Sequence, residues 1–167
     1  MNRNILITGG FSEKGCELID YLLSNTNHFV INVDSFQNNS EKNDEWKTYK
    51  NYLSIRTSLI NIECLEFMIF NYSVDTMVHF AYDYSFTEFP RLLYENVFAT
   101  SILLDLCTKY NVDHFYTLSE EVESNNIVNP IMEVKSQLTS LFSYFKNVHK
   151  KTIVLLKNME EIKRLTN

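Results

Sequence analysis

The sequence predicts an α/β fold in which a doubly wound parallel sheet of about six strands is flanked by helices. Two observations predict it. Short apolar runs alternate with stretches of helical periodicity along all 167 residues, which is typical of consecutive βαβ units. A glycine-containing turn joins the first run directly to the first helical stretch. Since 45% of the residues are hydrophobic, the chain is long enough to bury one core, and we expect a single domain over residues 1–167.

The first half of the chain begins with two apolar runs, 4–9 and 28–34, which predict strands one and two. Between them, four apolar side chains share one helical face: Leu18, Ile19, Leu22 and Leu23. That helix is predicted to end near Asn25. The elements expected next are a polar loop with a short helix at 35–51, a strand at 52–57, a helix at 62–71 and a strand at 75–81.

The second half continues with a long helix predicted over residues 86–110. Six apolar side chains lie near one of its faces: Phe89, Leu93, Val97, Leu103, Leu104 and Cys107. The elements expected after it are a strand at 112–119, a helix at 129–147, a strand at 151–156 and a polar helix from 158. Ligands on such a sheet bind at the carboxyl ends of the strands, where the strand order reverses. We therefore expect a site built from residues that follow strands one, two, four and five.

The composition narrows the possible partners and compartments. A net charge of -6 without a basic stripe disfavours nucleic acid and anionic membrane surfaces as partners. No run approaches the ~18 apolar residues of a membrane span, and the N-terminus lacks the features of a secretory signal. Cys16, Cys64 and Cys107 lie far apart without metal-ligand spacing. We expect a cytoplasmic protein with reduced cysteines and no metal.

The turn after strand one, from Gly9 to Gly15, has the spacing of a dinucleotide cradle. Such a turn needs one glycine for the bend, one for close approach of a pyrophosphate, and one for packing the helix on the strand. Gly9 and Gly15 fit the first and third roles, whereas Ser12 occupies the middle one. Asp34 ends strand two, where a carboxylate can accept hydrogen bonds from a ribose. The alternative is that these residues only end strands and begin turns.

Several segments together resemble one family. "ILITGGFSEKG" is similar to its "ILVTGGAGFIG", "VINVDSFQNNS" to "VVNVDKLTYAGN", and "DTMVHFAYDYS" to "DAVIHLAAESH". "YENVFATSILLDLC", which includes Asn96, resembles "ETNVVGTYNLLEAA", and "HFYTLSEEV" resembles "FVHISTDEVYG". The chain is thereby identified as similar to the extended short-chain dehydrogenase/reductases of the NAD-dependent epimerase/dehydratase type, most of all the dTDP-glucose 4,6-dehydratases. This implies a Rossmann-type sheet.

The resemblance also implies site residues. NAD would lie on the cradle, contacted by residues at the matching positions: Gly9, Ser12, Gly15, Asp34, Ala81 and Lys135. The catalytic positions of the family fall on Ser119, Glu120, Glu121 and Lys135. The family tyrosine, four residues before the lysine, falls on Ile131. In that pair the ammonium lowers the pKa of the phenol so that it exchanges a proton near neutral pH. Isoleucine has no proton to exchange.

Further departures agree with a loss of catalysis. Ser12 and Glu13 add a side chain and a negative charge to the cradle, and Tyr82 and Tyr84 replace small residues that line the cofactor. Residues 55–61, "IRTSLIN", lack the Asp-Ile doublet that holds adenine, and the C-terminal sugar-binding portion of the family is absent from the sequence. We therefore expect a pseudoenzyme that serves as a binding or assembly module, with weak or no binding of NAD.

Other possibilities stay open. An active nucleotide-sugar dehydratase or epimerase would need a rebuilt site or a partner chain that supplies the sugar-binding part. Tyr82, Tyr84 or Tyr116 could replace the phenol, although proximity without a lysine partner does not lower the pKa of a phenol. The helices at 86–110 and 130–147 correspond to the dimer interface of the family, so a homodimer is expected. Pairing with a full-length relative is a further possibility.

Overall fold

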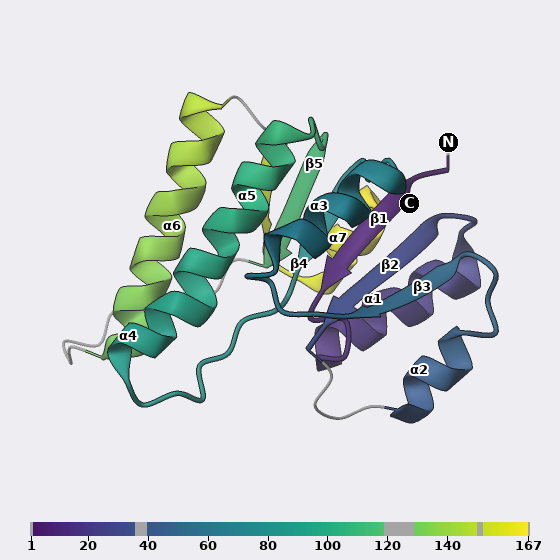
Figure 1. The fold of residues 1–167 in the computed structure, drawn as a ribbon, viewed down its shortest axis with the longest axis horizontal. Helices are drawn as coiled ribbons and strands as arrows, with labels where there is room; N and C mark the ends of the chain where they lie inside the picture. Colours follow the sequence, from purple (N-terminus) through teal and green to yellow (C-terminus); the bar gives the residue numbers. More distant parts are fainter. Residues whose placement is uncertain (1, 36–39, 119–128, 150–151, 167) are drawn as a thin grey trace.

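The computed structural model describes residues 2–35, 40–118, 129–149 and 152–166 (Figure 1). Six parallel strands form one sheet in the order β3-β2-β1-β4-β5-β6. Their bounds are β1 Asn4–Thr8, β2 Phe29–Asp34, β3 Tyr52–Arg56, β4 Thr76–His79, β5 His114–Leu118 and β6 Thr152–Leu156. The strand order reverses between β1 and β4, so the predicted doubly wound fold is confirmed.

Helices connect the strands and cover both faces of the sheet (Figure 1). Their bounds are α1 Glu13–Asn25, α2 Ser40–Trp46, α3 Ile62–Asn71, α4 Phe89–Leu92, the π-helical η1 Leu93–Phe98, α5 Ala99–Lys109, α6 Pro130–Val148 and α7 Met159–Leu165. Side chains of α3, α5 and α6 share one buried cluster with alternate residues of the strands. Side chains of α1, α2 and α7 share a second cluster on the opposite face. The apolar runs of the sequence are therefore buried on both sides of the sheet.

Helix α1 follows directly from its sequence pattern. The four apolar residues predicted to share a face are all at most 6% exposed, and they pack in the cluster that also holds Ile5 and Ile7 of β1. Ser12 caps the first turn, and the helix ends at Asn25, as predicted. The start of the helix therefore lies close to the end of β1.

The helix predicted over residues 86–110 is corrected by the structure. It begins at Phe89, with Pro90 in the first turn, and its middle portion η1 is a π-helix. Within it, the Asn96 side chain donates to the Leu92 carbonyl at 2.9 Å and to the Asp83 carbonyl at 2.8 Å. The distortion therefore lies where a buried side chain joins the helix to the preceding loop. Such π-helical turns are rare and are frequently found at functional sites.

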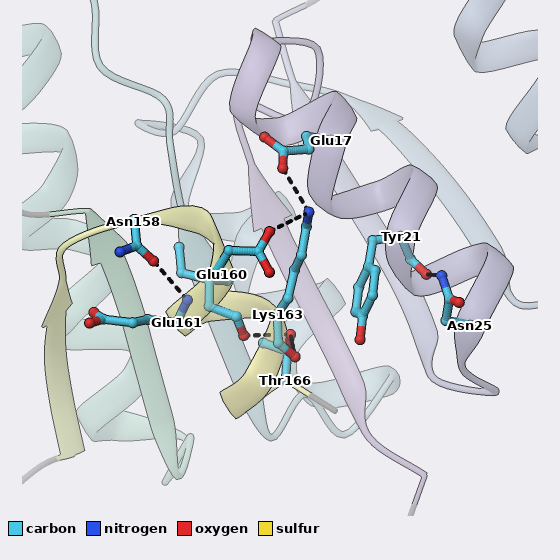
Figure 2. A network of polar contacts seen from close by, with 9 residues as sticks. Glu17, Tyr21, Asn25, Asn158, Glu160, Glu161, Lys163 and Thr166 are labelled. Carbon is cyan, nitrogen blue, oxygen red and sulfur yellow. Dashed lines mark hydrogen bonds and ion pairs between the residues drawn. The ribbon is translucent and has the colours of Figure 1, made fainter.

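Besides the shared apolar cluster, a lysine joins the last helix to the first (Figure 2). Lys163 Nζ lies 2.7 Å from a carboxylate oxygen of Glu17 on α1 and 3.2 Å from one of Glu160 on α7. The hydrogen bond to Glu17 is the main reason that the pKa of Lys163 is raised above its ordinary value. Arg3 adds a bond from its guanidinium to the Leu165 carbonyl. These contacts thus tie α7 to α1, on the same face of the sheet, and to the residue that precedes β1.

No helix within the described ranges is long and apolar enough to span a membrane.

Candidate functional site

A cavity of about 380 Å³ opens at the carboxyl ends of β1, β2, β3 and β4. Its volume lies within the ~300–1,000 Å³ that is common for ligand sites. Residues from all four strand ends line it: Gly9, Phe11, Ser12, Val33, Asp34, Ser35, Thr57, Ser58, Leu59, Ile60, Phe80, Ala81, Tyr82 and Asp83, with Glu95 and Ala99 from the following helix. We refer to it as the larger cavity. It lies beside the reversal between β1 and β4, where the topology favours a ligand.

The glycine turn has the backbone geometry that its sequence predicts. Gly9 has a φ of +71°, a conformation that side chains rarely adopt. A Cβ on Gly9 would lie 2.6 Å from the Ala81 nitrogen, and one on Gly15 would lie 2.4 Å from the Gly9 carbonyl oxygen. Gly9 therefore permits the bend, and Gly15 permits close packing of α1 against the end of β1.

Ser12 holds this turn together. Its hydroxyl donates to the Gly9 carbonyl at 2.7 Å and accepts from the Gly15 amide at 3.1 Å. The sequence predicted a side chain at the point of close approach to a ligand, and the residue does line the larger cavity. Its oxygen, however, also caps α1, which the spacing did not indicate. One donor at the positive end of the helix is therefore already occupied by protein.

Asp34 also contacts the turn. One of its carboxylate oxygens accepts a hydrogen bond from the Phe11 amide at 3.1 Å, and the residue lines the larger cavity. The Phe11 ring stacks on Trp46 of α2, with 5.6 Å between the ring centroids. The carboxylate thus fixes the turn and borders the cavity at once.

Asn96 fixes the loop after β4, whose Asp83 lines the larger cavity. Its side chain accepts from the Asp83 amide and donates to the Asp83 carbonyl, both at 2.8 Å. Thr100 donates to the Asn96 carbonyl and lies 2.9 Å from Nε2 of His79, whose Nδ1 lies 2.6 Å from the Thr8 hydroxyl. Asn96 was identified from the resemblance alone, and its contacts with the Asp83 backbone were not predicted from the sequence.

His79 is fully buried and bonded at both ring nitrogens. Burial lowers its pKa to about 3, which keeps the imidazole neutral. It is therefore a core residue, not a general base at the surface of the cavity.

The predicted catalytic positions are only partly described. Ser119, Glu120 and Glu121 lie outside the described residues. Ile131 is half-buried in the first turn of α6 and packs against the cluster of that face. Lys135 lies one turn further along α6, with Nζ 5.5 Å from the centroid of the Tyr84 ring. Of the three tyrosines considered as a replacement for the phenol, Tyr84 therefore has a lysine neighbour.

The other tyrosines occupy different places. Tyr82 has its hydroxyl 3.1 Å from Thr117 and its ring stacked with that of Tyr84, 6.2 Å between centroids. Tyr116 is buried in the cluster on the far face of the sheet. A smaller cavity, of about 210 Å³, lies beside Tyr82 and Tyr84 and reaches Glu13 and Lys14. Lys135 and Tyr84 also border a third cavity of about 50 Å³.

No group of three or more His, Cys, Asp or Glu residues with the arrangement of a metal site occurs in the part of the chain that the structure describes.

Comparison with known families then identifies the type of domain. The model of the NAD dependent epimerase/dehydratase family matches residues 5–128, which include the glycine turn, Asp34 and the end of β4. The chain belongs to this family. The resemblance inferred from the sequence is thereby confirmed at family level.

Individual relatives of this epimerase/dehydratase domain agree. The dTDP-glucose 4,6-dehydratase of Haemophilus influenzae is 28% identical over 123 residues, which make up 70% of this chain and 35% of that enzyme. Among solved structures, UDP-glucuronic acid 4-epimerase of Bacillus cereus with NAD superposes with a TM-score of 0.80 at 20% identity. UDP-glucose 4-epimerase of Thermotoga maritima with UDP-glucose gives 0.78 at 22%. Each covers 92% of this chain, while the chain spans 56% and 54% of those structures.

NAD fits this epimerase/dehydratase domain only in part. The larger cavity, the Gly9 bend and the Asp34 carboxylate suit the adenosine end of the cofactor. At the other end, the stacked rings of Tyr82 and Tyr84 line the smaller cavity beside Glu13. Ile131, at the position that the resemblance assigns to the family tyrosine, has no exchangeable proton. The residues present therefore do not fit the nicotinamide end.

Proposed function

We propose that this chain is a nucleotide-binding module that uses the larger cavity for an adenosine group and does not catalyse the reaction of its family. The observation that carries the proposal is the coincidence, in one cavity, of the Gly9 bend, the Asp34 carboxylate and the ends of four strands. Similar structures from Bacillus cereus and Bacillus anthracis were solved with NAD, which supports a nucleotide as the ligand.

Contacts available in the larger cavity support an adenosine group. A carboxylate such as Asp34 accepts hydrogen bonds from ribose hydroxyls, and the hydroxyls of Thr57 and Ser58 offer further polar contacts at the end of β3. Leu59 and Ile60 provide an apolar wall for a flat base. The loss of catalysis is argued from Ile131, because a side chain without an exchangeable proton removes a contribution of ~10²–10⁴ in rate.

A second candidate function is favoured by one contact. Lys135 lies over the Tyr84 ring, and both residues border the third cavity. The Tyr84 phenol and the Lys135 ammonium are therefore candidates for a rebuilt acid/base pair. In that case the chain is an active nucleotide-sugar dehydratase or epimerase whose sugar-binding part comes from another chain.

Calorimetric titration with AMP tests the first proposal. We expect binding, and a roughly 10-fold weaker affinity in the variant Asp34→Asn, because a hydrogen bond to a charged acceptor contributes ~1.5–3 kcal/mol and the amide retains part of it. Asp105→Asn is the matched control, since Asp105 is exposed on α5 and does not line the larger cavity. Its affinity should equal that of the native chain.

Two outcomes count against the proposal. The absence of binding by both AMP and NAD⁺ would leave the larger cavity without a nucleotide. Turnover of dTDP-glucose or UDP-glucose in the presence of NAD⁺, if abolished by Tyr84→Phe, would establish the second candidate instead.

A further inference from the structure

Tyr82 stands between the larger cavity and the smaller one. It lines both, together with Ser12 and Phe80. Its hydroxyl lies 3.1 Å from Thr117 Oγ1, and its ring meets His79 edge-on at 4.4 Å between centroids. The Thr117 hydroxyl in turn donates to the His79 carbonyl at 2.9 Å. The phenol is thus held at its tip and along its ring, so it separates the two cavities as a fixed wall.

A dinucleotide would have to cross that wall. Its two halves are joined by a pyrophosphate, which on this fold lies at the glycine turn, so the second half would extend from the larger cavity into the smaller one. There it would meet the stacked rings of Tyr82 and Tyr84 and the Glu13 side chain in the first turn of α1. A single nucleoside needs only the larger cavity.

The charges that line the larger cavity also disfavour a dinucleotide. Three acidic side chains line the larger cavity, Asp34, Asp83 and Glu95, and no lysine or arginine does so among the described residues. Acidic side chains are good acceptors for ribose hydroxyls and for an exocyclic amine, but they repel phosphate. Lys14, the single lysine or arginine at the smaller cavity in the part of the chain that the structure describes, is accompanied by Glu13. Each phosphate added to a nucleoside therefore weakens its electrostatic match to the site.

We infer that the site recognises a nucleoside or nucleoside monophosphate and discriminates against the pyrophosphate-linked dinucleotide that related proteins hold. This inference rests on the proposed function, because it concerns the ligand of the same cavity. It assigns Tyr82 and the acidic wall as the determinants of that selectivity.

Titration with adenosine, AMP, ADP and NAD⁺ tests it. In the native chain, affinity should fall along the series, with NAD⁺ at least about 10-fold weaker than AMP. Higher salt should narrow the gap in affinity between AMP and NAD⁺, because it screens repulsion between partly exposed charges. In Tyr82→Ala the gap should shrink to about 3-fold, because the wall between the cavities is removed. Tyr144→Ala, at an exposed position of α6, is the matched control and should leave the gap unchanged.

A second variant keeps the test valid if Tyr82→Ala fails to fold. Glu95→Gln removes a charge at nearly constant volume. It should strengthen the binding of ADP, relative to that of adenosine, about 3-fold. Thermal melting of each variant checks that it is folded. If native protein binds NAD⁺ as tightly as AMP or more tightly, the inference is overturned while the proposed function stands. If no member of the series binds, the proposed function itself has failed.

Discussion

Replacing Gly15 by alanine is expected to lower the free energy of unfolding by about 2–4 kcal/mol. The added Cβ would lie 2.4 Å from the Gly9 carbonyl oxygen and 2.6 Å from the Gly10 Cα. Both are backbone atoms, so α1 or the turn has to move. Helix propensity alone predicts the opposite sign, since alanine in a helix is favoured over glycine by about 1 kcal/mol. The sign of the change in the free energy of unfolding therefore shows whether close packing or helix propensity decides the effect of this substitution.

Thermal and denaturant unfolding measure this effect. For a chain of this size the expected loss corresponds to a fall in melting temperature of about 5–15 °C. Lys14→Ala is the matched control, because Lys14 is an exposed neighbour in the same turn, and it should change stability by less than about 0.5 kcal/mol. An unchanged or raised stability of the Gly15 variant would show that α1 does not pack against the turn as described.

Acidification below about pH 6.5 should destabilise the fold through His79. In the folded chain burial lowers the pKa of His79 to about 3, whereas in the unfolded chain it should have its ordinary value of about 6.5. Between these values the unfolded state binds the proton and the folded state does not. The stabilising contribution is therefore complete above about pH 6.5, falls by up to ~1.4 kcal/mol per pH unit, and is exhausted near pH 3.

The test compares urea unfolding of the native chain and of His79→Gln between pH 7 and 4. Glutamine loses some hydrogen bonding to Thr8 and Thr100, so the variant should be less stable at pH 7. Its free energy of unfolding should also fall less steeply on acidification, because unfolding of the variant takes up about one proton fewer than unfolding of the native chain. Parallel curves would contradict the account. Should the variant not fold, NMR of the imidazole nitrogens gives the answer, because the His79 ring in native protein should stay neutral at pH 5.

Much of the fold could be predicted because local and tertiary preferences agree. Helix α3 was predicted at its observed bounds, and Asn61 caps its first turn. The strands were recognised from apolar runs, although the prediction extended several by one or two residues at their ends. The π-helix at 93–98 could not be predicted, because it accompanies a contact between Asn96 and the distant Asp83 backbone. Hydrophobic periodicity carries no information about such a bond.

The candidate site was predicted in part for the same reason. Gly9, Gly15 and Asp34 follow buried strands directly, so their place at the strand ends was fixed by the order of elements. The contact between Tyr84 and Lys135 joins the loop after β4 to α6, 51 positions apart in the chain. The acidic side chains Asp83 and Glu95 likewise line the same cavity as Asp34 only because the sheet brings their segments together. The sequence predicted that residues after strands one, two and four would share a site, but it did not indicate that these three carboxylates would line one cavity.

Amide chemical-shift mapping with AMP tests the central claim most directly. If the larger cavity holds the adenosine group, the amides of Gly9, Phe11 and Asp34 at the turn and of Leu59 and Ile60 after β3 should move together and saturate at one affinity. The amides of α7, which contributes no residue to the lining of the larger cavity, should stay in place. Saturable shifts confined to residues away from the larger cavity, or no shifts at all, would contradict the account.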